Sequence, residues 1–175
     1  MTQREWTDPA PFMQGVLDTA ICLGYRLAYL GLRAWWFVRR PATHGACVAL
    51  WHGGKILLVR TSYRRCYSLP GGFVRRGEPS EQAACRELRE EVGVDLSDQS
   101  LRLAWSGTLP YEARQDTVDI WEALVETAPA VRITSHELTW AGWVDPGAAL
   151  ARRLLPHVAT YLARKSEKGE NVRRV

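Results

Sequence analysis

Cysteine is scarce in this chain of 175 residues, and its placement excludes two common structural uses. The four cysteines are Cys22, Cys47, Cys66 and Cys85, with no CxxC pair among them and no histidine at zinc-finger spacing. We therefore expect no disulfide framework and no zinc site, but reduced and buried thiols that behave as small apolar side chains. Reduced cysteines in turn favour a cytoplasmic location.

The chain also lacks a strong charge of one sign. Its net charge of +4 comes from the two ends, and the central part, residues 42–163, is close to neutral. This balance argues against nucleic acid as a partner, because a nucleic-acid interface needs a basic face. There is no internal repeat. The polar start "MTQREWTDPAP" and the lack of a small-residue cleavage site predict that there is no secretory signal peptide.

The first long pattern that is present is helical. From residue 12 to residue 38, apolar side chains recur at steps of three and four and leave only a narrow polar side. This predicts an amphipathic helix about 40 Å long, which Pro41 ends. Such a helix can pack on its own domain, form a homodimer seam, or contact a membrane peripherally through residues 12–40. A transmembrane span is the fourth alternative, and Asp18 and Arg26 would make it costly. At the far end, Trp35, Trp36, Arg39 and Arg40 suit the headgroup region of a lipid surface.

After Pro41, short apolar runs alternate with turns and predict strands. They cover residues 44–51, 55–61, 101–109, 118–126 and 137–144, with a loop at 110–117. Helices are expected at about 79–92 and 150–164. The predicted organisation is a helical extension at 1–41, one domain at 42–164 and a basic, disordered tail at 165–175. The fold class is α/β, a mixed sheet between two helical layers.

The densest group of acids lies in "LPGGFVRRGEPSEQAACRELREEVGV", residues 69–94. Glu87, Glu90 and Glu91 are three or four positions apart and therefore share one helix face, where like charges repel. Arg86 offsets only part of that repulsion. A solvated acidic face is one explanation. The glycine turn just before the helix favours another, a hard cation such as Mg²⁺ bound next to phosphate oxygens.

The same stretch resembles the Nudix box at every defining position from Gly72 to Val94. The resemblance implies a Nudix-type α/β/α sandwich with a mixed sheet that hydrolyses a pyrophosphate bond with Mg²⁺, for which Mn²⁺ can substitute. It also implies roles for individual residues. Glu87, Glu90 and Glu91 would be catalytic metal ligands, with the carbonyl of Gly71 beside them. Arg86 would orient these glutamates, and Glu78 would stabilise the loop and helix geometry.

The family's general base is not fixed in position, so several acids remain candidates. Glu137, just ahead of a predicted aromatic strand, is the first. Glu112 and Asp116, in the predicted loop, are two others, and in some members of the family a glutamate of the box is the base. For substrate binding we expect Arg60, Arg75, Arg76 and Tyr67, which flank the glycine turn and can reach phosphate or stack on a base. Arg64 and Tyr63 belong to the same segment.

The substrate is not determined by the sequence. Pro110 resembles a proline of members that cleave ADP-ribose, whereas Tyr111 resembles a tyrosine of members that cleave diadenosine polyphosphates, so both hints occur together. The expected substrate is a nucleoside diphosphate linked to another moiety, of the ADP-ribose, dinucleotide, nucleotide-sugar or nucleoside-triphosphate type. The alternatives are a Nudix sensor that binds nucleotides without hydrolysis, an isoprenoid-diphosphate isomerase, and an enzyme acting on RNA 5′ ends.

Overall fold

The fold is built around β1 (Ala42–His52), the central strand of a six-stranded mixed sheet. The computed structural model describes residues 16–96 and 99–173. Residues 46–51 of β1 are all buried, as expected for a strand covered on both faces. The strand order is β4-β5-β1-β2-β6, and the short β3 pairs with the first half of β1. The other strands are β2 (Lys55–Thr61), β3 (Gly71–Phe73), β4 (Arg102–Tyr111), β5 (Arg114–Leu124) and β6 (Leu138–Val144).

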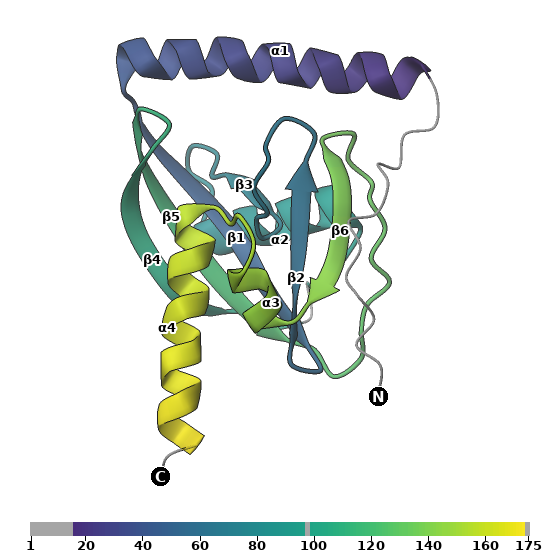
Figure 1. The fold of residues 1–175 in the computed structure, drawn as a ribbon, viewed down its shortest axis with the longest axis vertical. Helices are drawn as coiled ribbons and strands as arrows, with labels where there is room; N and C mark the ends of the chain where they lie inside the picture. Colours follow the sequence, from purple (N-terminus) through teal and green to yellow (C-terminus); the bar gives the residue numbers. More distant parts are fainter. Residues whose placement is uncertain (1–15, 97–98, 174–175) are drawn as a thin grey trace.

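Helices cover both faces of this sheet, so the predicted three-layer sandwich is confirmed (Figure 1). On one face, α2 (Ser80–Val92) packs Ala84, Leu88 and Val92 onto the sheet. On the other face lie α3 (Pro146–Leu150) and α4 (Pro156–Arg173), which contribute Val158 and Leu162 to a second core. The period of three to four in each helix and of two in the strands puts these apolar residues on facing surfaces.

Two segments differ from the sequence-based expectations. Residues 110–117 are not a loop: β4 and β5 form a hairpin that turns at Glu112 and Ala113, whose φ angles are 49° and 63°. The turn contains no glycine that would have predicted it. Pro110 is tolerated because β4 is an edge strand of the sheet. The second difference is at the C-terminus, where α4 continues to Arg173, past the predicted start of a disordered tail.

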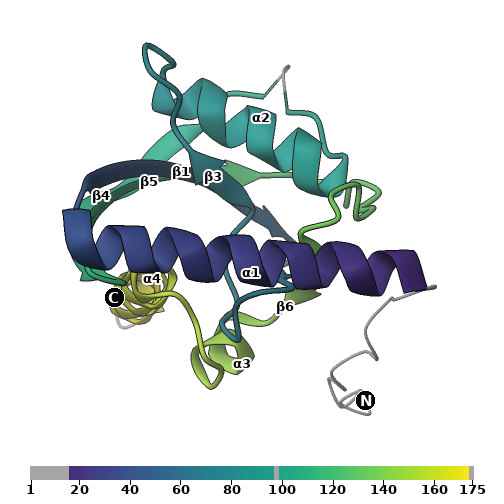
Figure 2. The same cartoon turned by 90° about the horizontal axis from the view of Figure 1, so that it is seen from above.

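The N-terminal helix, α1 (Val16–Arg39), forms a separate layer across one end of the sheet. Figures 1 and 2 show it running over the strand ends, between α2 on one side and α4 on the other. Two residues link it to β1, and the carbonyl of Pro41 accepts a hydrogen bond from the backbone of Gln115. None of the helices in residues 16–96 and 99–173 is both long enough and apolar enough to cross a membrane.

The amphipathic pattern of α1 is inverted relative to that of an ordinary surface helix. Its polar side faces the domain: Arg26 donates to the carbonyl of Ser62 at 3.1 Å, and Arg33 lies 3.8 Å from Glu112. Trp36 is the one fully buried large side chain of the described part of α1, at 2% exposure, so its predicted place at a lipid headgroup is wrong. The outward side is apolar and consists of Leu23, Leu27, Leu30, Trp35, Phe37 and Val38, each more than half exposed.

Candidate active site

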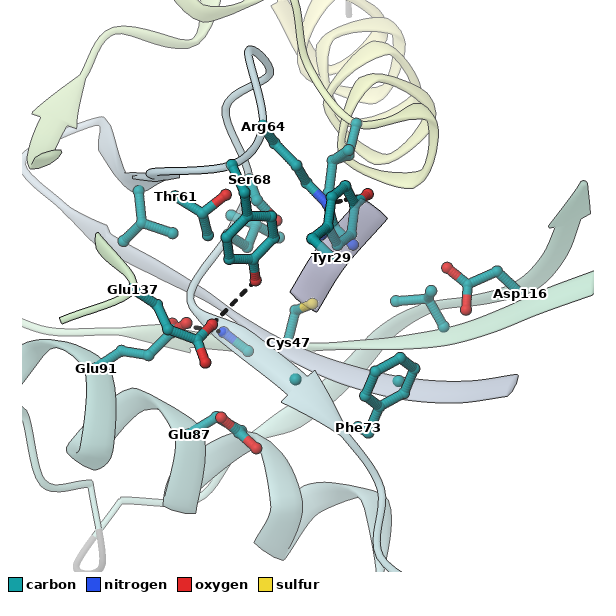
Figure 3. A pocket seen from close by; sticks show the side chains of 18 of the residues that line it. Tyr29, Cys47, Thr61, Arg64, Ser68, Phe73, Glu87, Glu91, Asp116 and Glu137 are labelled. Atoms are coloured by element: carbon teal, nitrogen blue, oxygen red, sulfur yellow. Dashed lines mark hydrogen bonds between the residues drawn. The ribbon is translucent and has the colours of Figure 1, made fainter. Parts of the chain in front are cut away.

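A cavity of about 480 Å³ lies between the sheet, α2 and the inner side of α1. Its floor includes the glycine turn at Gly71 and Gly72, and its roof includes Tyr25, Tyr29 and Leu32 of α1. Figure 3 shows Glu87, Glu91 and Glu137 on one side of this space and Asp116 on the other. The cavity therefore brings together residues from the box, the strand ends and the N-terminal helix.

Glu91 is the most deeply placed acid of the box. Its side chain accepts a hydrogen bond from the backbone N–H of Gly71 at 3.0 Å, which fixes the helix to the turn. Burial raises the pKa of Glu91 to about 8, and the negative charges of Glu87 and Glu137 add to the effect. Removal from water disfavours the ionised form of Glu91, and the hydrogen bond from Gly71 N–H does not offset this cost.

Gly72 lets the carboxylate of Glu87 lie against the backbone. A Cβ at this position would stand 2.6 Å from Cδ and from Oε1 of Glu87, closer than real contacts allow. A Cβ on Gly71 would stand 2.3 Å from the carbonyl oxygen of Ala46, and its φ of 155° adds strain for any other residue. The two glycines therefore have different roles: Gly72 makes room for the carboxylate of Glu87, and Gly71 lets the backbone pass close to β1.

Arg86 holds the outer part of the acidic face together. Its guanidinium donates to Glu78 at 2.8 and 3.0 Å, to Glu87 at 2.6 Å and to Glu90 at 3.5 Å. Bonding to Arg86 first, and to the backbone N–H of Arg75 next, lowers the pKa of Glu78 to about 2. These contacts are those expected if Arg86 orients the glutamates and Glu78 stabilises the loop against the helix.

Glu90 differs from the other two box acids in its surroundings. It lies outside the cavity lining, its side chain is 52% exposed, and it also lies 3.9 Å from Arg75. The expected set Glu87, Glu90 and Glu91 is therefore not gathered around one point in this arrangement. The part of Glu90 in metal binding stays a prediction.

Of the three acids considered as a general base, Glu137 lies with the box acids. It immediately precedes β6, lines the cavity, and accepts a hydrogen bond from the hydroxyl of Tyr63 at 2.9 Å (Figure 3). Glu112 lies on the β4–β5 turn, bonded by the hydroxyl of Tyr29. Asp116 lines the cavity but pairs with Arg114 at 3.1 Å.

The substrate-binding residues expected from the sequence are only partly in the cavity. Arg75 lines it, whereas Arg76 is exposed on the box loop. Tyr67 is buried at 5% exposure, packs edge-on against Trp140 and belongs to the second core. Arg60 donates a hydrogen bond to its hydroxyl, and neither residue lines the cavity. Arg64 lines the cavity, where it donates to the hydroxyl of Tyr29 at 2.9 Å.

Sequence reasoning missed the contribution of α1, of Arg114 and of His157. The signal for α1 was available: Arg26, Tyr29 and Arg33 recur at steps of three and four and so form one stripe along the helix. No local pattern marks Arg114 or His157, which come together only through the parallel pairing of β5 with β1 and the start of α4. These residues therefore required the structure.

The donor set of this cavity fits a divalent cation. Among residues 16–96 and 99–173, no three His, Cys, Asp or Glu side chains stand close enough to hold a metal ion as they lie. The chemistry is nevertheless suitable, because Glu87, Glu91 and Glu137 line one space and Glu91 is buried with a raised pKa. Carboxylate oxygens are the ligands that Mg²⁺ and Mn²⁺ prefer, and a cation would relieve the mutual repulsion of these acids.

His157 predicts a pH dependence of folding. Burial lowers its pKa to about 4, against the opposing attraction of Asp116 and together with repulsion from Arg64 and Arg114. Between pH 6.5 and 4 the unfolded chain binds a proton that the folded chain does not, so stability falls as pH falls. Over this pH range the contribution of His157 to the free energy of unfolding changes by about 3 kcal/mol.

We expect His157→Gln to flatten the stability profile between pH 4 and 6.5 by most of that amount. Chemical denaturation in EDTA at several pH values measures it. Glu91 acts in the opposite direction, since its raised pKa makes stability fall as pH rises. The contribution of Glu91 is common to both proteins, so it cancels when the profile of His157→Gln is subtracted from that of the wild type. Parallel profiles for wild type and variant would contradict the burial of a neutral imidazole.

Comparison with known proteins agrees with the geometry. The profile of the NUDIX domain matches residues 41–165. An NAD-capped RNA hydrolase NudC of Erwinia tasmaniensis is 29% identical over 133 residues, which cover 70% of this chain and 49% of that protein. An ADP-ribose pyrophosphatase of Methanocaldococcus jannaschii is 46% identical over 50 residues, 27% of this chain and 30% of that protein. The chain thus spans less than half the length of either curated relative.

Among solved structures, a C. elegans Ap4A hydrolase in a binary complex superimposes with a TM-score of 0.64. The match covers 74% of this chain and 98% of that one, at 21% sequence identity. At that identity the likeness establishes the fold, and the residues of the cavity have to be argued from this chain itself.

Proposed function

Because the chain belongs to the NUDIX domain family, we propose that it is a metal-dependent hydrolase that cleaves a pyrophosphate bond in a nucleoside diphosphate linked to another moiety. The observation that supports this most directly is the gathering of Glu87, Glu91 and Glu137 in one cavity next to a glycine turn. Such a site can bind the diphosphate and a water molecule on the same side.

The residues of the site have distinct roles in this proposal. Glu87, Glu90 and Glu91 would hold Mg²⁺ or Mn²⁺. When bound, the cation neutralises charge on the diphosphate and makes water a better nucleophile. Arg86 keeps Glu87 in place, as its 2.6 Å bond indicates. Glu137 takes the proton of the attacking water, while the hydroxyl of Tyr63 orients its carboxylate.

The substrate types to be tested follow from the cavity and from the relatives. ADP-ribose, dinucleoside polyphosphates and NAD-capped ends all contain a nucleoside diphosphate linked to a second group. A screen for phosphate or nucleotide release should include these, nucleotide sugars and nucleoside triphosphates, with Mg²⁺ and with Mn²⁺. A selective, metal-dependent hit is expected. If nucleotides bind and none is cleaved, the sensor alternative replaces hydrolysis. Turnover of an isoprenoid diphosphate instead would replace it with isomerisation.

The outward side of α1 supports a second proposal, about location. Exposed leucines in a row are unusual on a surface with no partner, and they stand opposite the side that packs on the domain. Residues 19–41 contain four arginines and no acid. Two copies of this helix would have little counter-charge for each other, because Asp18 is the one acid between residues 16 and 41, whereas an anionic lipid surface supplies such a charge. We therefore propose a cytoplasmic enzyme that contacts anionic membranes peripherally and favour this over a homodimer.

Replacing Leu27 and Leu30 with glutamate should abolish this contact. We expect the wild type to sediment with vesicles of phosphatidylglycerol and the variant to stay in the supernatant. Leu124→Glu is a matched control, because Leu124 is 75% exposed and lies on β5, outside α1. Light-scattering mass at the same concentration tests the alternative: a dimer that the Leu27 and Leu30 changes dissociate, with no vesicle binding, would show that α1 is a seam between two copies.

A further inference from the structure

The wall of the cavity that faces the box acids contains polar groups with unmet hydrogen-bonding capacity. The side chain of Arg114 is only 3% exposed, and its Nη2 donates to Asp116 at 3.1 Å. Its Nε and Nη1, and Nε2 of His157, have no hydrogen-bond partner within residues 16–96 and 99–173. All three residues line the cavity. Buried donors without acceptors are unfavourable, so this wall is suited to a ligand that completes them.

The surroundings of Arg114 fix the direction of its free donors. Trp36 of α1 lies against the guanidinium with its ring centre 3.8 Å from Cζ, while Phe73 and Tyr111 flank it at 5.7 and 5.6 Å. Stacking occupies the flat face of a guanidinium and leaves its N–H groups directed outward in the plane. With Nη2 bonded to Asp116, the edge formed by Nε and Nη1 is the part that still lacks an acceptor.

The charge of this wall selects the chemistry of that ligand. Asp116, which also accepts a bond from the hydroxyl of Thr43 at 2.5 Å, balances the charge of Arg114. His157 is neutral at pH 7, since burial keeps its pKa at about 4. Arg64 also lines the cavity, but its guanidinium donates to the hydroxyl of Tyr29. A phosphate bound at Arg114 would therefore face the carboxylate of Asp116 while the charge of Arg114 is already balanced. An uncharged group with paired oxygens satisfies the donors of Arg114, and its own O–H can donate to the imidazole.

We propose that Arg114 and His157 form a sugar subsite, in which a vicinal diol of the substrate accepts hydrogen bonds from Arg114 and bonds to His157. Asp116 and Trp36 position the guanidinium. The inference rests on the proposed function only in taking the sugar to be part of a nucleotide substrate. The diol has two sources, the ribose of the nucleoside or the sugar linked through the diphosphate.

A binding comparison with single-hydroxyl pairs tests the subsite without requiring hydrolysis. Calorimetry with Mg²⁺ would compare ribose 5-phosphate with 2-deoxyribose 5-phosphate, and AMP with 2′-deoxy-AMP. We expect the wild type to favour the hydroxylated member of one pair by about tenfold. Arg114→Met should reduce that preference to less than about twofold, because the hydroxyl then has no partner. His157→Gln should reduce it in part. The pair that responds identifies which sugar occupies the subsite.

Arg114→Lys guards the test against a folding defect, since it keeps the charge opposite Asp116 and loses the paired edge. If Arg114→Met does not fold by circular dichroism, a loss of preference in Arg114→Lys decides in its place. The inference is overturned if the wild type distinguishes neither pair, binds none of the four compounds, or keeps its preference in the Arg114 variants. A negative hydrolysis screen with the preference intact would overturn only the proposed function. Hydrolysis without any preference would overturn only the subsite.

Discussion

Glu91→Gln is expected to remove hydrolysis while making the metal-free protein more stable. The amide can still accept the bond from Gly71 N–H, so the link between helix and turn survives. The charge that would hold the cation does not, and we expect activity to fall by about 10²–10⁴-fold. In EDTA the variant should melt higher, because a buried carboxyl with a pKa of about 8 must either carry a proton or pay for its charge above that pH. Rate assays and thermal melts at pH 8.5 measure both effects.

Glu81→Gln is the control for this experiment, since Glu81 lies in the first turn of the same helix and outside the cavity lining. It should leave both quantities close to those of the wild type. Glu90→Gln belongs in the same series, as it is the remaining expected ligand. Activity of Glu91→Gln near the wild-type level would contradict the metal site. Full activity of Glu90→Gln would limit the metal ligands to the acids that line the cavity.

Gly72→Ala is expected to cause a comparable loss of activity by a different route. The added methyl group would stand 2.6 Å from the carboxylate of Glu87, and a side chain can swing away where a backbone cannot. The fold should therefore persist while Glu87 leaves the cavity, and metal affinity should fall with activity. Mn²⁺ binding by calorimetry, together with hydrolysis rates, measures the predicted link between the two.

Substitutions of two other glycines serve as comparisons for Gly72→Ala. Gly71→Ala should lower the yield of folded protein, because its Cβ would meet the carbonyl oxygen of Ala46 and its φ is strained for alanine. Gly31→Ala lies in α1 with nothing within 4 Å of the added carbon, and should stabilise by about 0.5–1 kcal/mol. Normal metal affinity in a folded Gly72→Ala would show that the position of Glu87 does not depend on this glycine.

The sequence predicts the sandwich and the acidic helix well because both depend on local patterns. Pro79 and Gly93 bound α2 almost as expected, with Gly93 in the left-handed conformation at a φ of 68°. Strands 55–61 and 137–144 were placed within a residue of β2 and β6. In each case periodicity and turn residues agree with the tertiary structure, so local and global preferences reinforce each other.

The rest of the site depends on long-range contacts that no local pattern encodes. Arg114 belongs to β5 and is buried by Trp36, 78 positions earlier in the chain. The sequence-based interpretation placed that tryptophan at a lipid surface because a mostly apolar helix does not show which side faces inward. The sequence suggests Tyr67 as a stacking residue, and in the structure it is part of the core. Aromatic residues serve both uses, and only packing distinguishes them.

The short joint between α1 and β1 has a consequence for how this protein can change. The proposed chemistry belongs to residues 69–94 and Glu137, whereas one wall of the cavity comes from a helix that Arg40 and Pro41 join to β1. Exchange of the segment before residue 41 would alter the shape offered to the substrate and leave the acids of the box untouched. The part of the selectivity that depends on Tyr25, Tyr29 and Leu32 is therefore encoded apart from the acids of the box, while Arg114 and His157 remain with the domain.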